Sequence, residues 1–137
     1  MHIILNMPRQ YKIHIEEDGK SKPRPHELKI AEILSEYFKS DVIFLRRLSS
    51  KTPDLYILKT NIRWELKSPE GAGKHTIQTN LRNASKQSEN IILDLHRSKL
   101  TKEQAISRAN DFIKNEHSKI KRLKIITKSD QVIDIIS

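Results

Sequence analysis

The chain has 137 residues, of which 36% are hydrophobic, and it carries no cysteine and a formal net charge of +9 at pH 7. This length favours one domain, and the lack of cysteine excludes disulfide bonds and thiolate chemistry. No apolar stretch is long enough to cross a membrane, and the N-terminal MHIILNMPRQ lacks the features of a signal peptide. The excess of Lys and Arg over Asp and Glu, 26 against 17, favours a polyanionic partner such as nucleic acid. The alternative is a basic surface that serves solubility alone.

The predicted elements alternate between strands and helices. In chain order, the apolar pattern predicts a strand or arm at 11–17, a loop at 18–25, an amphipathic helix at 26–40, a strand at 41–47, a hairpin around Thr60 and Asn61, a helix at 76–88, a short buried strand at 90–95, a helix at 101–117, and two closing strands around Ser129 and Asp130. This order predicts an α/β fold in which helices flank a central mixed sheet. We expect a single domain over 1–137, with an N-terminal arm at 1–25, a core at 26–98, and a C-terminal helix and strands at 99–137.

Charged residues in the predicted hairpin have a spacing that places them on one face. Glu65 and Lys67 alternate with Trp64 and Leu66, and Asp54 lies in the preceding strand. If the hairpin pairs Asp54 with Glu65, their carboxylates repel each other unless a cation lies between them. Mg²⁺, or Mn²⁺ in its place, suits such a site because it binds through one or two carboxylates and accepts phosphate oxygens. Lys67 would then stabilise the negative charge that develops on phosphorus.

A further acid, Glu27, lies at the start of the first predicted helix. Glu27, Ala31 and Leu34 share one helical face, so Glu27 is expected to point toward the sheet, whereas Glu32 and Glu36 are expected in solvent. Two interpretations of Glu27 stay open. It belongs to the same site as the hairpin acids, or it is a first-turn acid that the helix dipole favours.

The helix at 76–88 and the turn before it are basic. Gln78 and Arg82 are one turn apart on a side that could face the site. Lys74, His75, Arg82 and Lys86 are candidate contacts to phosphates on either side of a scissile bond. The alternatives are an ordinary cationic surface for the four residues, and for His75 a general acid of metal-independent RNA cleavage.

Pro53-Asp54, ten intervening residues and then Glu65-Leu66-Lys67 resemble the motif of the PD-(D/E)xK nuclease superfamily. A narrower resemblance covers residues 26–98. The segments TPDLYI and WELKSPEGAGKHTIQTNLRNASKQSENIILDL are similar to the CdiA C-terminal tRNase toxin domains of bacterial contact-dependent growth inhibition.

The resemblance implies a restriction-endonuclease-like core and a metal-dependent endoribonuclease that cleaves tRNA in the cytosol of a target cell. It implies Asp54 and Glu65 as metal ligands, Lys67 as the catalytic lysine, Glu27 as the first-helix acid and Gln78 as a supporting polar residue. It also implies a cognate immunity protein, which the net charge of +9 predicts to be acidic. Two alternatives stay open: a DNA endonuclease with the same site, and a basic nucleic-acid-binding module without activity.

Overall fold

The structure is a computed structural model of the chain that describes residues 10–16, 22–45, 54–116 and 119–137. The elements in chain order are β1 (Ile13–Ile15), α1 (Pro25–Phe38), β2 (Val42–Phe44), β3 (Asp54–Ile57), β4 (Ile62–Lys67), α2 (Thr76–Ser85), β5 (Asn90–Asp94), α3 (Lys102–Asn115), β6 (Arg122–Ile126) and β7 (Val132–Ile136). This succession confirms the predicted order of strands and helices. Within the described ranges, every helix is too short or too polar to cross a membrane.

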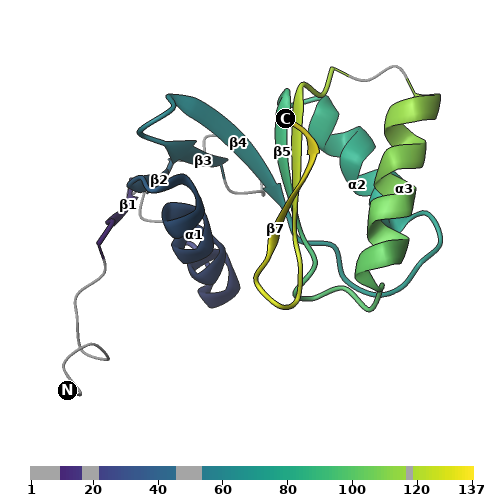
Figure 1. The fold of residues 1–137 in the computed structure, drawn as a ribbon, viewed down its shortest axis with the longest axis horizontal. Helices are drawn as coiled ribbons and strands as arrows, with labels where there is room; N and C mark the ends of the chain where they lie inside the picture. The colour runs from purple at the N-terminus through teal and green to yellow at the C-terminus, as the bar shows by residue number, and fades with distance from the viewer. Residues whose placement is uncertain (1–9, 17–21, 46–53, 117–118) are drawn as a thin grey trace.

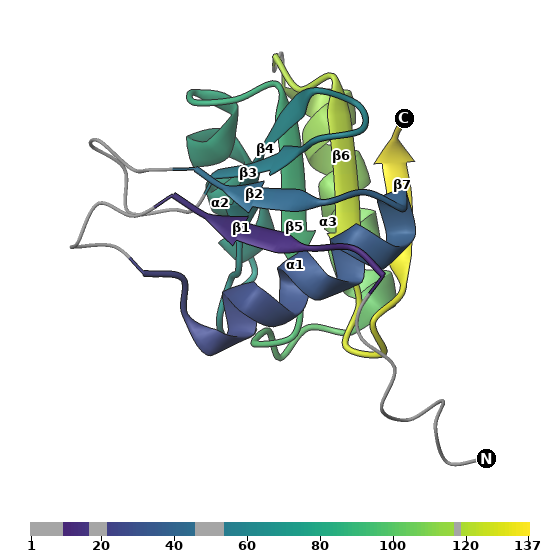
Figure 2. The same ribbon diagram turned by 90° about the vertical axis from the view of Figure 1, so that its left-hand side faces the viewer.

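The described strands form one mixed sheet whose spatial order is the chain order, β1 to β7 (Figures 1 and 2). β2, β3 and β4 form an antiparallel meander, and β1 pairs with β2 in parallel. β4, β5 and β6 are parallel to one another, and β7 pairs with β6 in the antiparallel direction. The helices α2 and α3 make the long connections that parallel neighbours require. The predicted mixed α/β architecture is thereby confirmed.

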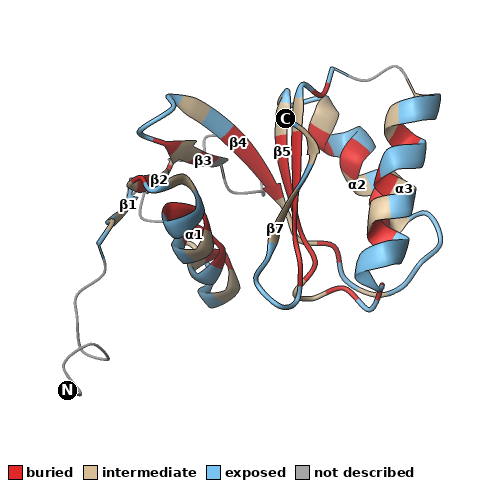
Figure 3. Ribbon diagram, in the orientation of Figure 1, coloured by how far each residue is buried: buried red, intermediate tan, exposed pale blue. Residues whose placement is uncertain are grey.

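Helices cover both faces of the sheet (Figure 1). On one face, α1 packs on the strands in a cluster that contains Ile30, Leu34, Leu55, Trp64, Leu66, Ile92 and Ile126. On the other face, α2 and α3 cover a cluster that contains Ile77, Leu81, Ile91, Leu93, Phe112, Leu123 and Ile125. The buried residues of each helix lie on the side that faces the sheet (Figure 3). Because β5 contributes to both clusters, it is buried on both faces, as its apolar run predicts.

The helix ends follow from local sequence. α1 begins at Pro25, whose fixed φ suits a first helical position. The chain leaves α1 through Lys39 in the left-handed region, with φ 52°. α3 begins after Thr101, whose hydroxyl accepts the Gln104 N–H at 3.1 Å while the Gln104 side chain accepts the Thr101 N–H at 3.0 Å. This reciprocal pair is a capping box that fixes the start of α3.

Some predicted boundaries are too long. The strand expected at 11–17 spans Ile13–Ile15, and the helix expected at 76–88 ends at Ser85. The end of the strand predicted at 41–47 lies partly outside the described residues, and β2 spans Val42–Phe44. The residues beyond these ends still make local backbone hydrogen bonds, such as Glu16 N–H to the Phe44 carbonyl at 3.0 Å and Ser88 N–H to the Ala84 carbonyl at 3.0 Å, and element ends commonly shift by one or two residues.

Candidate active site

The two hairpin residues Glu65 and Lys67 lie on the face of the sheet that α2 and α3 cover. Their Cα partners on β5 are Ile91 and Leu93, which belong to the cluster under these helices. Trp64 and the other alternate residues of β4 belong to the cluster under α1. Because side chains alternate along a strand and paired residues share a face, Glu65 and Lys67 point toward the α2 side.

Glu65 is a buried acid, with a relative exposure of 2%. The β3–β4 register pairs it with Asp54 as Cα partners, which is the pairing that the sequence predicts. Residues paired in this way have Cβ atoms about 4.5–5.5 Å apart. The Asp54 side chain lies outside the described part of the structure, so its role as a ligand stays a prediction. The described residues contain no group of three His, Cys, Asp or Glu side chains that could hold a metal ion.

The hairpin that sets this register turns through Asn61, which has φ 56°. Asn61 tolerates the left-handed region because its short polar side chain bonds locally. Its Oδ1 accepts a hydrogen bond of 2.6 Å from the Tyr56 hydroxyl. Tyr56 therefore supports the hairpin turn.

Lys67 is half-buried at the carboxyl end of β4. The loop that follows β4 is bonded to the loop that follows β5. Gly71, with φ 79°, forms a bridge with Ser98, and its carbonyl accepts the Lys99 N–H at 2.8 Å. The positive φ explains the glycine at this turn. The loops after β4 and β5 are thereby held together beside the candidate site.

Gln78 has an unsatisfied polar atom. Its Oε1 is buried and has no hydrogen-bond partner among the described residues. Gln78 follows the buried Ile77 on α2, and α2 contacts both β4 and β5. A buried acceptor without a partner costs about 1–3 kcal/mol, so this oxygen is a candidate for contact with a bound ion, water or substrate.

Glu27 is buried, with an exposure of 7%, as its place on the helical face predicts. Its Oε1 accepts the Arg24 N–H at 2.8 Å, which satisfies a free amide at the start of α1. α1 covers the face opposite to that of Glu65. These contacts favour the interpretation of Glu27 as a helix-terminal acid, and its role in the site stays a prediction.

The predicted phosphate contacts differ in their surroundings. Lys74, His75 and Lys86 are exposed. Arg82 is also exposed, but its guanidinium donates to both carboxylate oxygens of Glu116 at 2.9 Å. This hydrogen bond raises the pKa of Arg82 above its ordinary value. A phosphate would have to compete with Glu116 for Arg82.

Sequence reasoning missed a polar cluster at the carboxyl ends of β4, β5 and β6. Asp94 is fully buried at the end of β5, where its Oδ2 accepts the Ser68 hydroxyl at 3.0 Å. Its Oδ1 lies 2.6 Å from Nδ1 of His96, and Nε2 of His96 lies 2.6 Å from Asp130. The signal was an acid inside the apolar run NIILDL, because a charge in a doubly buried strand requires partners.

The fold and the hairpin geometry thus define a mixed α/β protein with a buried acid, Glu65, paired with Asp54 and followed by Lys67 on one face. A profile of the contact-dependent growth inhibition CdiA C-terminal domain matches residues 51–132. The chain therefore belongs to this family of toxin domains of contact-dependent growth inhibition.

A solved structure supports the fold. The structure described as "CdiA-CT/CdiI toxin and immunity complex from Burkholderia pseudomallei" matches with a TM-score of 0.60 and 15% sequence identity, covering 92% of this chain and 99% of that chain. At this identity the likeness concerns the fold alone. No curated protein sequence matches the chain significantly.

Proposed function

We propose that this chain is a metal-dependent endoribonuclease that cleaves phosphodiester bonds of tRNA in the cytosol of a target cell. The observation that carries the proposal is the buried Glu65, paired with Asp54 across the hairpin and followed two residues later by Lys67 on the same face. Membership of a family of growth-inhibition toxins supports a nuclease activity. The core would then be that of the PD-(D/E)xK superfamily.

The donor set fits a divalent cation such as Mg²⁺ or Mn²⁺. Carboxylate and amide oxygens are the ligands that these hard cations prefer, and the Gln78 Oε1 is a buried acceptor without a partner among the described residues. Asp54 and Glu65 would hold the ion, and Gln78 would support it. When bound, the ion acidifies a water molecule and stabilises charge on the phosphate.

Lys67 supplies a positive charge beside the acids. Its ammonium would bind a nonbridging phosphate oxygen and stabilise the charge that accumulates there during cleavage. Lys74, His75 and Lys86 would hold neighbouring phosphates through exposed cations or hydrogen-bond donors. Arg82 would join them by exchanging the carboxylate of Glu116 for a phosphate, since a guanidinium binds both in the same bidentate geometry.

Two other functions account for part of these observations. A DNA endonuclease would use the same acids, because both nucleic acids present the same phosphates. Only the sequence resemblance to tRNase toxin domains supports RNA over DNA. A binding module without activity accounts for the net charge of +9, but gains nothing from acids that repel phosphate.

A cognate immunity protein is the second part of the proposal. The matched solved structure is described as a toxin and immunity complex. The net charge of +9 favours an acidic partner, since opposite charges speed association and select partners. Co-expression with a small acidic protein from the same gene neighbourhood should relieve growth arrest. Harmless expression of the chain alone would oppose this part.

The deciding experiment incubates the purified protein with total tRNA and with plasmid DNA, each with Mg²⁺, Mn²⁺ or EDTA. Glu65→Gln and Lys67→Ala test the site, and Glu36→Gln and Lys59→Ala change exposed charges as matched controls. Metal-dependent tRNA cleavage that the site variants alone abolish would support the proposal. Cleavage of DNA instead would be consistent with the proposed site but would refute tRNA as the substrate.

Cleavage of tRNA in EDTA would reject the metal. A 2′,3′-cyclic phosphate at the product end, lost in His75→Ala, would point to the metal-independent alternative. Binding of tRNA without cleavage under all conditions would leave the binding module as the function.

A further inference from the structure

His96 lies between two carboxylates from different parts of the fold. Its Nδ1 is 2.6 Å from Oδ1 of Asp94, and its Nε2 is 2.6 Å from Oδ1 of Asp130. Asp94 ends β5, and Asp130 lies in the turn between β6 and β7. The His96 side chain is only 16% exposed. The imidazole therefore connects the end of a central strand with a surface turn.

These two contacts require two protons on the imidazole. A neutral histidine has one N–H donor and one nitrogen that can only accept, and a carboxylate has no hydrogen to donate. With a single proton, one carboxylate of the pair would face a nitrogen lone pair at 2.6 Å. Both contacts are favourable only for the positively charged imidazolium.

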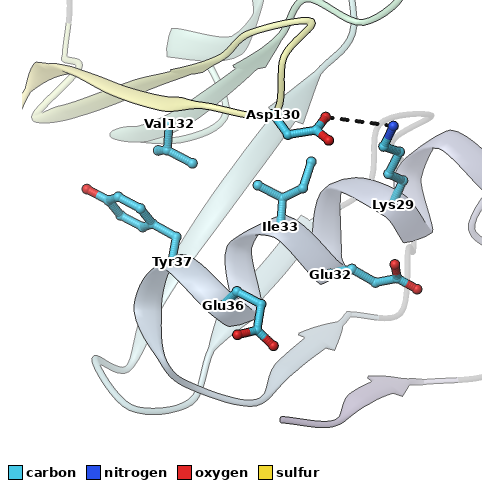
Figure 4. A pocket seen from close by; sticks show the side chains of 7 residues that line it. All are labelled: Lys29, Glu32, Ile33, Glu36, Tyr37, Asp130 and Val132. Carbon is cyan, nitrogen blue, oxygen red and sulfur yellow. Dashed lines mark ion pairs between the residues drawn. The ribbon is translucent and has the colours of Figure 1, made fainter. Parts of the chain in front are cut away.

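Other groups hold the two carboxylates in place. Asp94 accepts hydrogen bonds from the Ser68 hydroxyl and the His96 backbone N–H, both at 3.0 Å. Asp130 lies 3.7 Å from the ammonium of Lys29 on α1 (Figure 4). The hydrogen bond from His96 lowers the pKa of Asp130, and the charge of Lys29 acts in the same direction.

His14 provides a contrast within the same chain. Its Nε2 lies 3.0 Å from Oδ2 of Asp41, and its side chain is 48% exposed. One N–H satisfies this contact, so a neutral imidazole can keep it. The requirement for a second proton distinguishes His96 from His14 in the described structure.

We propose that Asp94, His96 and Asp130 form a proton latch, which holds the β6–β7 turn against the end of β5 while His96 carries two protons and releases the turn when one is lost. Histidine is the side chain whose charge changes most readily near neutral pH. Loss of one proton as the pH rises would open the latch. At low pH, protonation of Asp130 would also break it.

The latch has a consequence for the surface beside it. Asp130 and Val132 line one wall of a groove of about 550 Å³, and Ile33 and Tyr37 of α1 line the facing wall (Figure 4). Opening the latch removes one of the contacts that fix Asp130, so the wall formed by the turn gains freedom to move. The latch thus lies beside a groove on the face opposite to that of Glu65.

The test measures protons and turn protection in the same protein. Nitrogen NMR of the imidazole is recorded at about pH 5 and about pH 8, with amide hydrogen exchange of residues 127–131 corrected for intrinsic rates. We expect both His96 nitrogens to be protonated at the lower pH. We expect turn amides to exchange about tenfold faster at the higher pH, because local opening becomes easier. His14→Gln should leave this pH dependence unchanged.

Two variants separate the latch from general stability. His96→Gln should abolish the pH dependence of turn exchange, since glutamine does not titrate. Asp130→Asn removes only the exposed half of the latch, so it keeps the buried Asp94 contact and should also abolish the dependence. One protonated nitrogen at the lower pH, turn exchange that is insensitive to pH in the wild type, or a dependence that survives in Asp130→Asn would each overturn the proposal.

Discussion

Replacement of Glu65 by Gln should separate metal binding from folding. Glu65 is 2% exposed, so its carboxylate has lost nearly all contact with water. A buried charge costs several kcal/mol unless partners compensate for it. Glutamine keeps the shape and can still accept a hydrogen bond, so Glu65→Gln should still fold in EDTA. The same variant should lose the stabilisation that a bound cation provides.

The size of this difference follows from linkage. A cation present at a hundred times its dissociation constant stabilises the folded state by about 2.7 kcal/mol. Unfolding entropy of about 2.1 cal/mol/K per residue gives about 0.29 kcal/mol/K for 137 residues. The wild type should therefore melt about 9 °C higher with saturating Mn²⁺ or Mg²⁺ than in EDTA, and Glu65→Gln should show almost no change.

The assay is thermal unfolding followed by circular dichroism across a metal titration. Glu36→Gln is the matched control, because it removes an exposed acid of α1 and should keep the full metal response. An equal rise in the melting temperature of wild type and Glu65→Gln would refute the assignment of the ion to this residue.

Three further predictions concern the fold. Thr101→Ala should lower the free energy of unfolding by about 1 kcal/mol in urea titrations, since it removes the hydroxyl that caps Gln104; Thr101→Ser should retain it. The hydrogen bond from the backbone N–H of Lys12 lowers the pKa of Asp41. The stability that Asp41 contributes should therefore be present above about pH 4 and lost as the pH falls further. In Asp41→Asn, the free energy of unfolding should depend less on pH below about pH 4. Leu93→Ala, at a fully buried position, should lower the free energy of unfolding by about 2–5 kcal/mol, and a loss below about 1 kcal/mol would contradict the packing of α2 and α3 on β5.

Local patterns predicted the elements and part of the site. Alternation in β4 places Glu65 and Lys67 on one face, and the short hairpin leaves few registers, so the pairing of Asp54 with Glu65 was within reach of the sequence. The apolar face of α1 likewise predicted that Glu27 would be buried. Such inferences hold because the hydrophobic periodicity of an element and the length of a turn are determined by residues close together in the sequence.

The rest depends on contacts between distant segments. Arg82 and Glu116 are 34 residues apart, and no period predicts that they meet. The same separation divides His96 from Asp130. Which face α1 covers is decided by how the sheet as a whole is packed, and this choice placed Glu27 opposite to Glu65. Side-chain partners of this kind require the three-dimensional fold.

The agreement between chain order and spatial order in the sheet bears on how the protein assembles. Each strand of the described sheet after β1 pairs with the strand that precedes it in the sequence. A chain that emerges N-terminus first from a ribosome can therefore add every new strand at a free outer edge. No strand has to insert between two that have already paired. Unravelling from either end can follow the same path in reverse, one strand at a time.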